Sequence, residues 1–187
     1  MSAPAFKGVT YTSKRELMPK QTPLIFLGDS LFQFHDFSNF GPHHNAGIAG
    51  DTTDGILYRL HYTLEKEPSS LVLMIGINDL LQMQYVEIIK ENCLKIFKKL
   101  DLLDKVYICS ILPIEMMDGS FDINEKIIIL NHFLKQEALQ RGYIYVDIYR
   151  EMVAEDGGIQ KALSSDGLHL TAKAYTILEK VLKDHLQ

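Results

Sequence analysis

The sequence has no tryptophan and only two cysteines, Cys93 and Cys109, among its 187 residues. Cys93 falls in a helix-like stretch and Cys109 in a strand-like one, so we expect both to be small buried residues. Their spacing supports neither a disulfide nor a Cys/His metal site. A chain of this length buries enough surface to fold without either kind of cross-link.

Positive charge and long apolar runs are also scarce. The sequence has 19 basic and 24 acidic residues, which gives a net charge of −5, and it contains no basic stripe. Nucleic acid is therefore excluded as an expected partner. No apolar run approaches the roughly 20 residues of a bilayer span, and residues 1–17 lack the apolar core of a signal peptide. We expect a cytoplasmic protein without stable membrane association.

Strand-length apolar runs alternate with longer stretches of helical periodicity, and no repeat interrupts them. Strands are predicted over 23–29, 43–48, 70–76, 105–112 and 143–149, and helices over 52–66, 84–100, 123–141 and 171–185. This alternation predicts a three-layer α/β/α sandwich around a mostly parallel five-stranded sheet. Residues 1–187 are predicted to form a single domain, with residues 1–22 as an N-terminal extension packing on it.

Small and polar residues follow the first two predicted strands. The first strand runs into Gly28-Asp29-Ser30-Leu31, where a serine at a helix start is, by itself, most often a capping residue. The second is followed by a loop containing Gly50, a residue that lets the backbone N–H approach a ligand. Asp51 or Thr52 is the expected N-cap of the next helix.

Two further polar segments carry an amide and a histidine. Gly76-Ile77-Asn78-Asp79 follows the third strand, with Asn78 as a neutral donor and Asp79 as a candidate cap. Asp166-Gly167-Leu168-His169 precedes the last helix, for which Thr171 is a candidate cap. The three-residue separation lets the Asp166 carboxylate reach the His169 ring and fix its tautomer.

Each segment alone is best explained by turns and caps, but together they contain the groups needed for acyl transfer. Ser30 would be the nucleophile, His169 the base and Asp166 the acid that orients it. The N–H groups of Ser30 and Gly50 and the Asn78 amide would hold the oxyanion. Since ligand sites gather beyond the carboxyl ends of parallel strands, all four segments are predicted to meet at one edge.

The ordered blocks Gly28-Asp29-Ser30-Leu31, Asn45-x-Gly47-x-x-Gly50, Gly76-x-Asn78-Asp79 and Asp166-x-x-His169 resemble those of the SGNH (GDSL) hydrolase superfamily. HNAGIAGDTTDGILYRL and DGLHLTAKAY are most similar to its platelet-activating-factor acetylhydrolase-like branch of small acyl esterases. The resemblance implies a flavodoxin-like SGNH hydrolase fold and the same roles for these residues. It also implies a small acyl ester as substrate, a homodimer as one option for assembly, and no metal or cofactor.

Further residues are candidates for substrate binding. They are Leu31, Asp51, Met116, Met117 and Phe121, the last three in the loop after the fourth strand, where packing under the loop is an equal alternative. The aromatic set Phe32, Phe34, Phe37 and Phe40 is assigned to the core or to a subunit interface. His43 and His44 are adjacent on a strand and point to opposite faces, which argues against a metal pair.

The predicted function is a serine esterase that removes a short acyl group, acetyl, through an acyl-Ser30 intermediate. One alternative is a lysophospholipase or thioesterase that acts on longer acyl chains. A metal-dependent phosphoesterase is disfavoured, because no Asp-x-His precedes Gly28 and no histidine follows Asn78. A non-catalytic binding module with the same fold is the third alternative.

Overall fold

The computed structural model describes residues 23–116 and 120–186, without the side chains of residues 120 and 121. Its centre is a five-stranded sheet of order β2-β1-β3-β4-β5, and every pairing between these strands is parallel. The strands are β1 (Leu24–Gly28), β2 (His43–Gly47), β3 (Ser70–Met74), β4 (Lys105–Cys109) and β5 (Ile144–Val146). This is the flavodoxin-like strand order. The predicted extension 1–22 lies outside the described residues.

Successive strand residues divide between two cores because side chains alternate across a sheet. Ile25 and Leu27 pack into one hydrophobic cluster, and Phe26 between them packs into the other. Strands β3 and β4 divide in the same way. Both faces are therefore buried, which explains strands that are apolar at nearly every position rather than at alternate ones.

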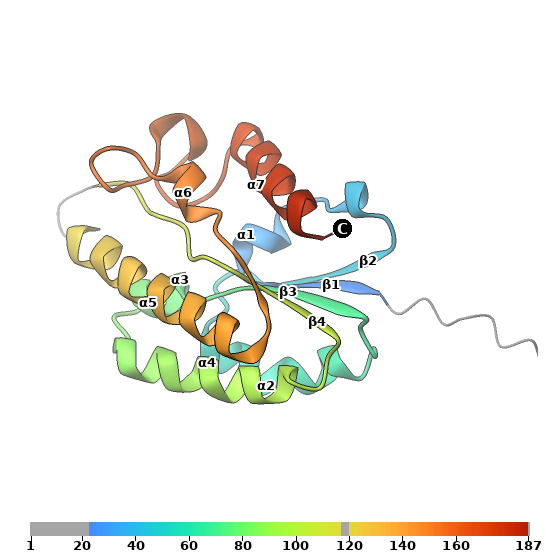
Figure 1. Ribbon diagram of the computed structural model, residues 1–187. Helices are drawn as coiled ribbons and strands as arrows, with labels where there is room; N and C mark the ends of the chain where they lie inside the picture. The colour runs from blue at the N-terminus through green and yellow to red at the C-terminus, as the bar shows by residue number, and fades with distance from the viewer. Residues whose placement is uncertain (1–22, 117–119, 187) are drawn as a thin grey trace, which may run out of the picture.

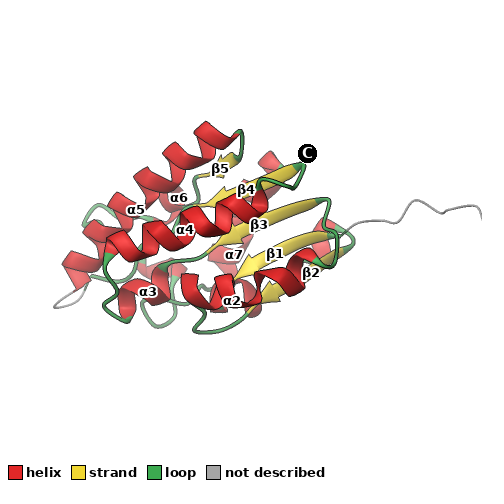
Figure 2. Ribbon diagram, turned by 90° about the horizontal axis from the view of Figure 1, so that it is seen from below, coloured by secondary structure: helices red, strands yellow, loops and turns green. Residues whose placement is uncertain are grey.

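Helices cover both faces of the sheet and make the three layers of Figure 1. The first face carries α2 (Thr53–Leu64), α3 (Ile77–Leu81), α4 (Val86–Leu100) and α5 (Ser120–Arg141). Figure 2 shows this layer in front of the sheet. The second face carries α1 (Ser30–Gln33), α6 (Tyr149–Met152) and α7 (Ala172–His185). Two 3₁₀ turns, η1 (Ser38–Phe40) and η2 (Lys161–Leu163), complete the elements.

The predicted sandwich is confirmed, with differences at the ends of elements. Residues 143–149 were expected to be one strand, but β5 has three residues, and the chain bends so that Tyr149 begins α6. The sheet is parallel at every pairing rather than mostly so. Cys93 and Cys109 are buried free thiols, as predicted. Within the described residues, no helix is both long and apolar enough to cross a bilayer.

The sheet order fixes where a ligand site can form. Strand β1 lies between β2 and β3, and the chain leaves β1 toward the second face but leaves β3 toward the first. Such a switch in direction opens a crevice beyond the carboxyl ends of these two strands. Ser30 and Asn78 follow β1 and β3, so both lie at this crevice.

Candidate active site

Ser30 opens helix α1, but it does not cap the helix. Asp29 is the N-cap, and its Oδ1 accepts the Leu31 N–H at 2.9 Å. The Ser30 side chain is left to face His169, and its Oγ lies 3.1 Å from the His169 Nε2. The capping role that the sequence allows for Ser30 therefore belongs to its neighbour.

His169 lies in a turn that is held by hydrogen bonds to the Asp166 side chain. The Asp166 Oδ1 accepts the N–H groups of Leu168 and His169, at 3.0 and 2.7 Å. Gly167 has a φ of +88°, a conformation that favours glycine. Its carbonyl accepts the Glu115 N–H at 2.8 Å, which fastens the turn to the segment after β4. Thr171 caps α7 as predicted, since its hydroxyl accepts the Ala174 N–H.

The same carboxylate fixes the imidazole. Asp166 Oδ2 lies 2.7 Å from the His169 Nδ1. An ionised carboxylate can only accept, so Nδ1 carries the proton and Nε2 is free to accept from the Ser30 hydroxyl. The hydrogen bond from the His169 side chain, followed by the two backbone N–H groups, lowers the pKa of Asp166 to about 2. Asp166 is therefore charged at neutral pH.

The N–H groups of Ser30 and Gly50 are the two backbone donors predicted to hold an oxyanion. Gly50 has a φ of +77°, which turns its peptide in a way that other residues rarely allow. Among the described residues, no acceptor takes the N–H of Ser30 or of Gly50. Both donors are thus free for a bound oxygen, which is the requirement for an oxyanion hole.

Asn78 is held beside the Gly50 loop. Its Nδ2 donates one hydrogen to the Asp51 carbonyl at 2.9 Å. A side-chain amide has two such hydrogens, so the second is available to a ligand. The bond ties helix α3 to the loop that follows β2, and it orients the third donor relative to the other two.

Partly buried polar contacts also hold the loop that carries Gly50. The Asp51 carboxylate binds the Arg59 Nε at 2.7 Å, and the Arg59 Nη2 donates to the Gly28 carbonyl at 3.1 Å. The Asp51 carboxylate is thus engaged by Arg59. A contact between Asp51 and the substrate stays a prediction. The same bonds connect the end of β1 to the Gly50 loop.

Asp79 lies inside α3 rather than at its N-cap, which is Gly76. Its buried carboxylate accepts the Thr53 hydroxyl at 2.6 Å and the Thr53 N–H at 3.0 Å. Burial raises the pKa of Asp79, and these hydrogen bonds oppose the shift. Asp79, a candidate cap in the sequence, instead joins α3 to the first turn of α2, whose N-cap is Thr52.

The other candidates for substrate binding are placed less favourably. Leu31 is 2% exposed and belongs to the core, which leaves little of it for contact with substrate. Met116 packs beside Gly158, and its Sδ accepts from the Asn124 amide at 3.3 Å. Met117 lies outside the described residues, as does the side chain of Phe121.

The predicted aromatic set divides between core and surface. Phe32 and Phe37 are buried as expected, and Phe37 stacks on Phe26. Phe34 is 60% exposed, and its ring centroid lies 5.7 Å from that of His169. It does not belong to the core, because the short helix α1 ends at Gln33 and turns this side chain outward. Its other predicted place, a subunit interface, stays a prediction.

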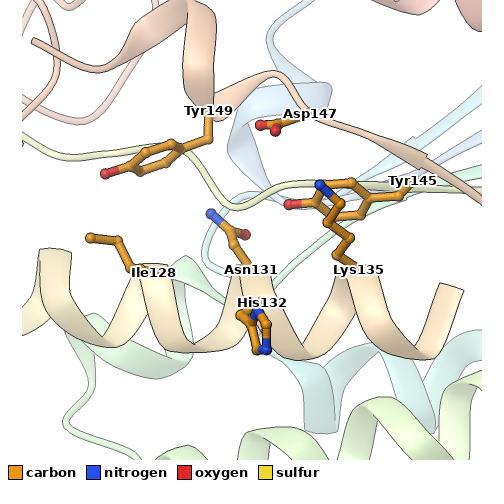
Figure 3. Close-up of a pocket in the computed structure, with 7 residues that line it drawn as sticks. All are labelled: Ile128, Asn131, His132, Lys135, Tyr145, Asp147 and Tyr149. Carbon is orange, nitrogen blue, oxygen red and sulfur yellow. The ribbon is translucent and has the colours of Figure 1, made fainter. Parts of the chain in front are cut away.

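A separate hollow of about 210 Å³ lies between α5 and the end of β5 (Figure 3). It is lined by Ile128, Asn131, His132, Lys135, Tyr145, Asp147 and Tyr149. The Asn131 amide there is occupied by the N–H and carbonyl of Ile111. None of the four predicted blocks lines this hollow. The part of the chain that the structure describes contains no cluster of three His, Cys, Asp or Glu side chains suited to a metal ion.

Asp29 is the remaining acidic group at the site. It is 1% exposed, and its Oδ2 has no partner among the described residues. Burial is the main cause that raises its pKa to about 7, and the Leu31 N–H opposes the shift. The folded protein therefore holds this proton at a pH where the unfolded chain, with a carboxyl near 3.8, has released it.

We expect Asp29→Asn to stabilise the protein at high pH. A raised carboxyl pKa costs the wild type stability as pH rises from about 4 to about 7, and the amide removes that cost. At pH 8 the variant should exceed the wild type by at least about 1.4 kcal/mol, the equivalent of one pKa unit. Near pH 4 the difference should shrink. Urea unfolding at both pH values measures it.

Asp36 supplies a control of opposite sign. Hydrogen bonds from the Ser38 N–H and hydroxyl lower the pKa of this exposed carboxyl. Its contribution to stability is present above its unfolded pKa and is lost as pH falls, so Asp36→Asn should be less stable than wild type at pH 8. Equal pH dependence in wild type and Asp29→Asn would contradict the assignment of a buried neutral acid.

A profile of the GDSL-like Lipase/Acylhydrolase family matches residues 26–177, from the middle of β1 into α7. This span includes the serine, the Gly50 loop, the amide and the histidine turn. The chain belongs to the GDSL-like lipase/acylhydrolase family. This is the family that the resemblance of its four blocks implied.

The chain is also similar to individual proteins. The chain is 26% identical over 186 residues to an N-acylneuraminate cytidylyltransferase from Escherichia coli O18:K1:H7, covering 91% of this chain. It spans only 42% of that relative's length. A structure described as a candidate platelet activating factor from Streptococcus pneumonia superposes with a TM-score of 0.78 at 25% identity, over 92% of this chain and 87% of that one.

An acetylxylan esterase from Geobacillus stearothermophilus has the same fold as this GDSL-like protein. The TM-score is 0.73 at 17% identity, over 87% of this chain and 93% of the esterase. At this identity the likeness concerns the fold alone.

Proposed function

We propose that the protein hydrolyses a short-chain carboxylic ester, with acetyl as the acyl group, through an acyl-Ser30 intermediate. The observation that carries this proposal is the chain of contacts from Ser30 Oγ to His169 Nε2 and from His169 Nδ1 to Asp166. The carboxylate fixes the tautomer in which Nε2 can take a proton from the serine hydroxyl. The two unpartnered N–H groups beside Asn78 supply the complementary donors.

In the proposed reaction, His169 Nε2 takes the Ser30 proton while Oγ attacks the acyl carbon. The carbonyl oxygen becomes an oxyanion that accepts from the Ser30 and Gly50 N–H groups and from the Asn78 amide. His169 then returns the proton to the leaving alcohol as the bond from carbon to the alcohol oxygen breaks. It next takes a proton from water, which attacks acyl-Ser30 and releases the acid.

The names of relatives support an acetyl ester of a sugar as the substrate. One structural neighbour is an acetylxylan esterase, and the E. coli relative acts on an N-acylneuraminate. We propose that the alcohol released from the ester by the present chain is likewise a sugar hydroxyl. Lysophospholipase or thioesterase activity on longer acyl chains is the alternative within the same chemistry.

A panel of esters tests the proposal and its alternatives. Hydrolysis of para-nitrophenyl esters with two to twelve acyl carbons should fall steeply beyond about four carbons, and acetylated sugars should be cleaved. A rate that rises with chain length would favour a lipase or lysophospholipase. Absence of hydrolysis together with unreactive Ser30 would favour a binding module. Loss of activity with a chelator would revive a metal-dependent mechanism.

Asn78→Ala should lower kcat by about 10²–10³, the usual effect of losing one oxyanion donor. The Gln82→Ala variant is the matched control, because it removes an exposed amide four residues further along the chain, at the C-cap of the same helix. It should keep the wild-type rate. Unfolding in urea must show that Asn78→Ala is folded, since the bond to Asp51 is lost as well. A near-normal rate in a folded Asn78→Ala would mean that the amide is not a donor.

A further inference from the structure

Phe34 is an exposed aromatic ring beside the proposed base. It is the C-cap residue of α1, four residues after Ser30, and 60% of its surface is exposed. Its ring is tilted by 55° against the His169 ring, with centroids 5.7 Å apart. Large apolar side chains that stay exposed next to a reactive centre need an explanation other than the core.

The chemistry decides which part of the substrate Phe34 borders. In the proposed reaction, His169 Nε2 gives its proton to the leaving oxygen, so the leaving alcohol must stand beside the imidazole. The oxyanion must point instead to the donors at Gly50 and Asn78. A ring in contact with His169 therefore flanks the leaving group rather than the oxyanion.

The exposed position of Phe34 is not explained by a need to hold the His169 ring in place. Asp166 already holds His169 through both the ring Nδ1 and the backbone N–H. The end of α1 is anchored at the residue before Phe34, because the Gln33 side chain accepts the Ala49 N–H in the loop that carries Gly50. The Phe34 ring that follows stays 60% exposed while it contacts His169.

The polar groups that follow Phe34 in the chain are already bonded to one another. A depression of about 400 Å³ between this segment and α7 is lined by His35, Asn39, Ala172, Tyr175, Thr176 and Glu179. The His35 ring and the Asn39 amide both bond to the Glu179 carboxylate, and the Thr176 hydroxyl donates to the Ala172 carbonyl. The exposed ring of Phe34, rather than this depression, is therefore the group available to a leaving alcohol.

We infer that Phe34 is the specificity-determining residue for the leaving alcohol, and that its ring packs against the apolar face of a sugar ring. This inference rests on the proposed function of Ser30 and His169. An aromatic face and a ring placed over it gain contact area that a small aliphatic alcohol cannot provide.

The test compares two acetyl esters with different alcohols. Phe34→Ala should lower kcat/KM for an acetylated methyl xylopyranoside about three- to tenfold, the range expected for the loss of one aromatic contact. It should change kcat/KM for ethyl acetate less than twofold. Phe34→Trp should keep the preference for the sugar ester. Tyr58→Ala, which removes an exposed aromatic ring from α2 on the opposite face of the sheet, should change neither rate.

Each other outcome has a definite meaning. Equal losses for both esters would make Phe34 a support for His169 and overturn the inference, as would unchanged rates for both. A wild-type protein that cleaves neither ester would contradict the proposed function itself. Normal cleavage by the wild type with no selective loss in Phe34→Ala would overturn the inference alone.

Discussion

Ser30→Ala is expected to lower kcat/KM for an acetyl ester by about 10⁴- to 10⁶-fold while the protein stays folded. The variant removes the proposed nucleophile, and no other hydroxyl within the described residues is bonded to the His169 ring. The Ser164 and Ser165 hydroxyls donate to the His169 backbone carbonyl instead. The fold should survive because Asp29, not Ser30, caps helix α1. The measurement is steady-state hydrolysis of para-nitrophenyl acetate, with circular dichroism and urea unfolding on the same sample.

A fluorophosphonate separates the nucleophile from a structural serine. It should label the wild type at one serine, identified by mass spectrometry as Ser30, and His169→Ala should abolish the label. Ser38→Ala is the matched control, because that serine is exposed and bonded to Asp36, so its loss should leave rate and label unchanged. Resistance of Ser30 to labelling in folded protein would show that the nucleophile is misassigned.

The sandwich could be predicted because burial on both faces leaves a plain trace in the sequence. Runs such as Leu24–Gly28 and Ser70–Met74 are apolar with little alternation, and the stretches between them carry one apolar face. Parallel strands then bring their carboxyl ends to one edge, so Ser30 and Asn78 could be placed together without a structure. The ends of β5 could not, because Tyr145 and Tyr149 suit a strand and a helix start about equally.

The hydrogen-bond partners of the acidic residues could not be predicted from the sequence. Asp29 and Ser30 both suit an N-cap, and only the position of His169, 139 residues away, shows which side chain is free. Asp79 is of a residue type that often caps helices, but its carboxylate accepts from Thr53, 26 residues earlier. Local preferences do not include such distant acceptors, so tertiary contacts decided both cases.

The phenylalanines show the same limit. Phe32 lies in the four-residue helix α1, Phe34 is the C-cap residue two positions later, and their sequence environment is similar. One side chain enters the core and the other meets His169, because residues two apart on a helix do not share a face. Predicting which of them is exposed requires the sheet face that α1 covers, and that follows only from the assembled fold.

Asp166→Asn is expected to lower kcat by about 10⁴-fold, because the variant traps the wrong tautomer of His169. Asp166 Oδ1 accepts two backbone N–H groups, from Leu168 and His169, and an amide oxygen can take over that role. The amide nitrogen then replaces Oδ2 opposite Nδ1 and donates to it. The proton of the imidazole moves to Nε2, which can no longer accept from Ser30.

The control for this variant lies in the same stretch of chain. Asp156→Asn makes the same exchange at an exposed carboxylate that accepts the Gly158 N–H, and it should leave kcat unchanged. Stopped-flow and steady-state assays near pH 7 suffice, because the pKa of Asp166 near 2 keeps the wild-type carboxylate charged there. A loss below tenfold in Asp166→Asn would mean that another group orients the imidazole. Since both Asp166 bonds to the backbone survive in the variant, a large loss with an unchanged unfolding midpoint would assign the effect to the proton on His169 rather than to the shape of the turn.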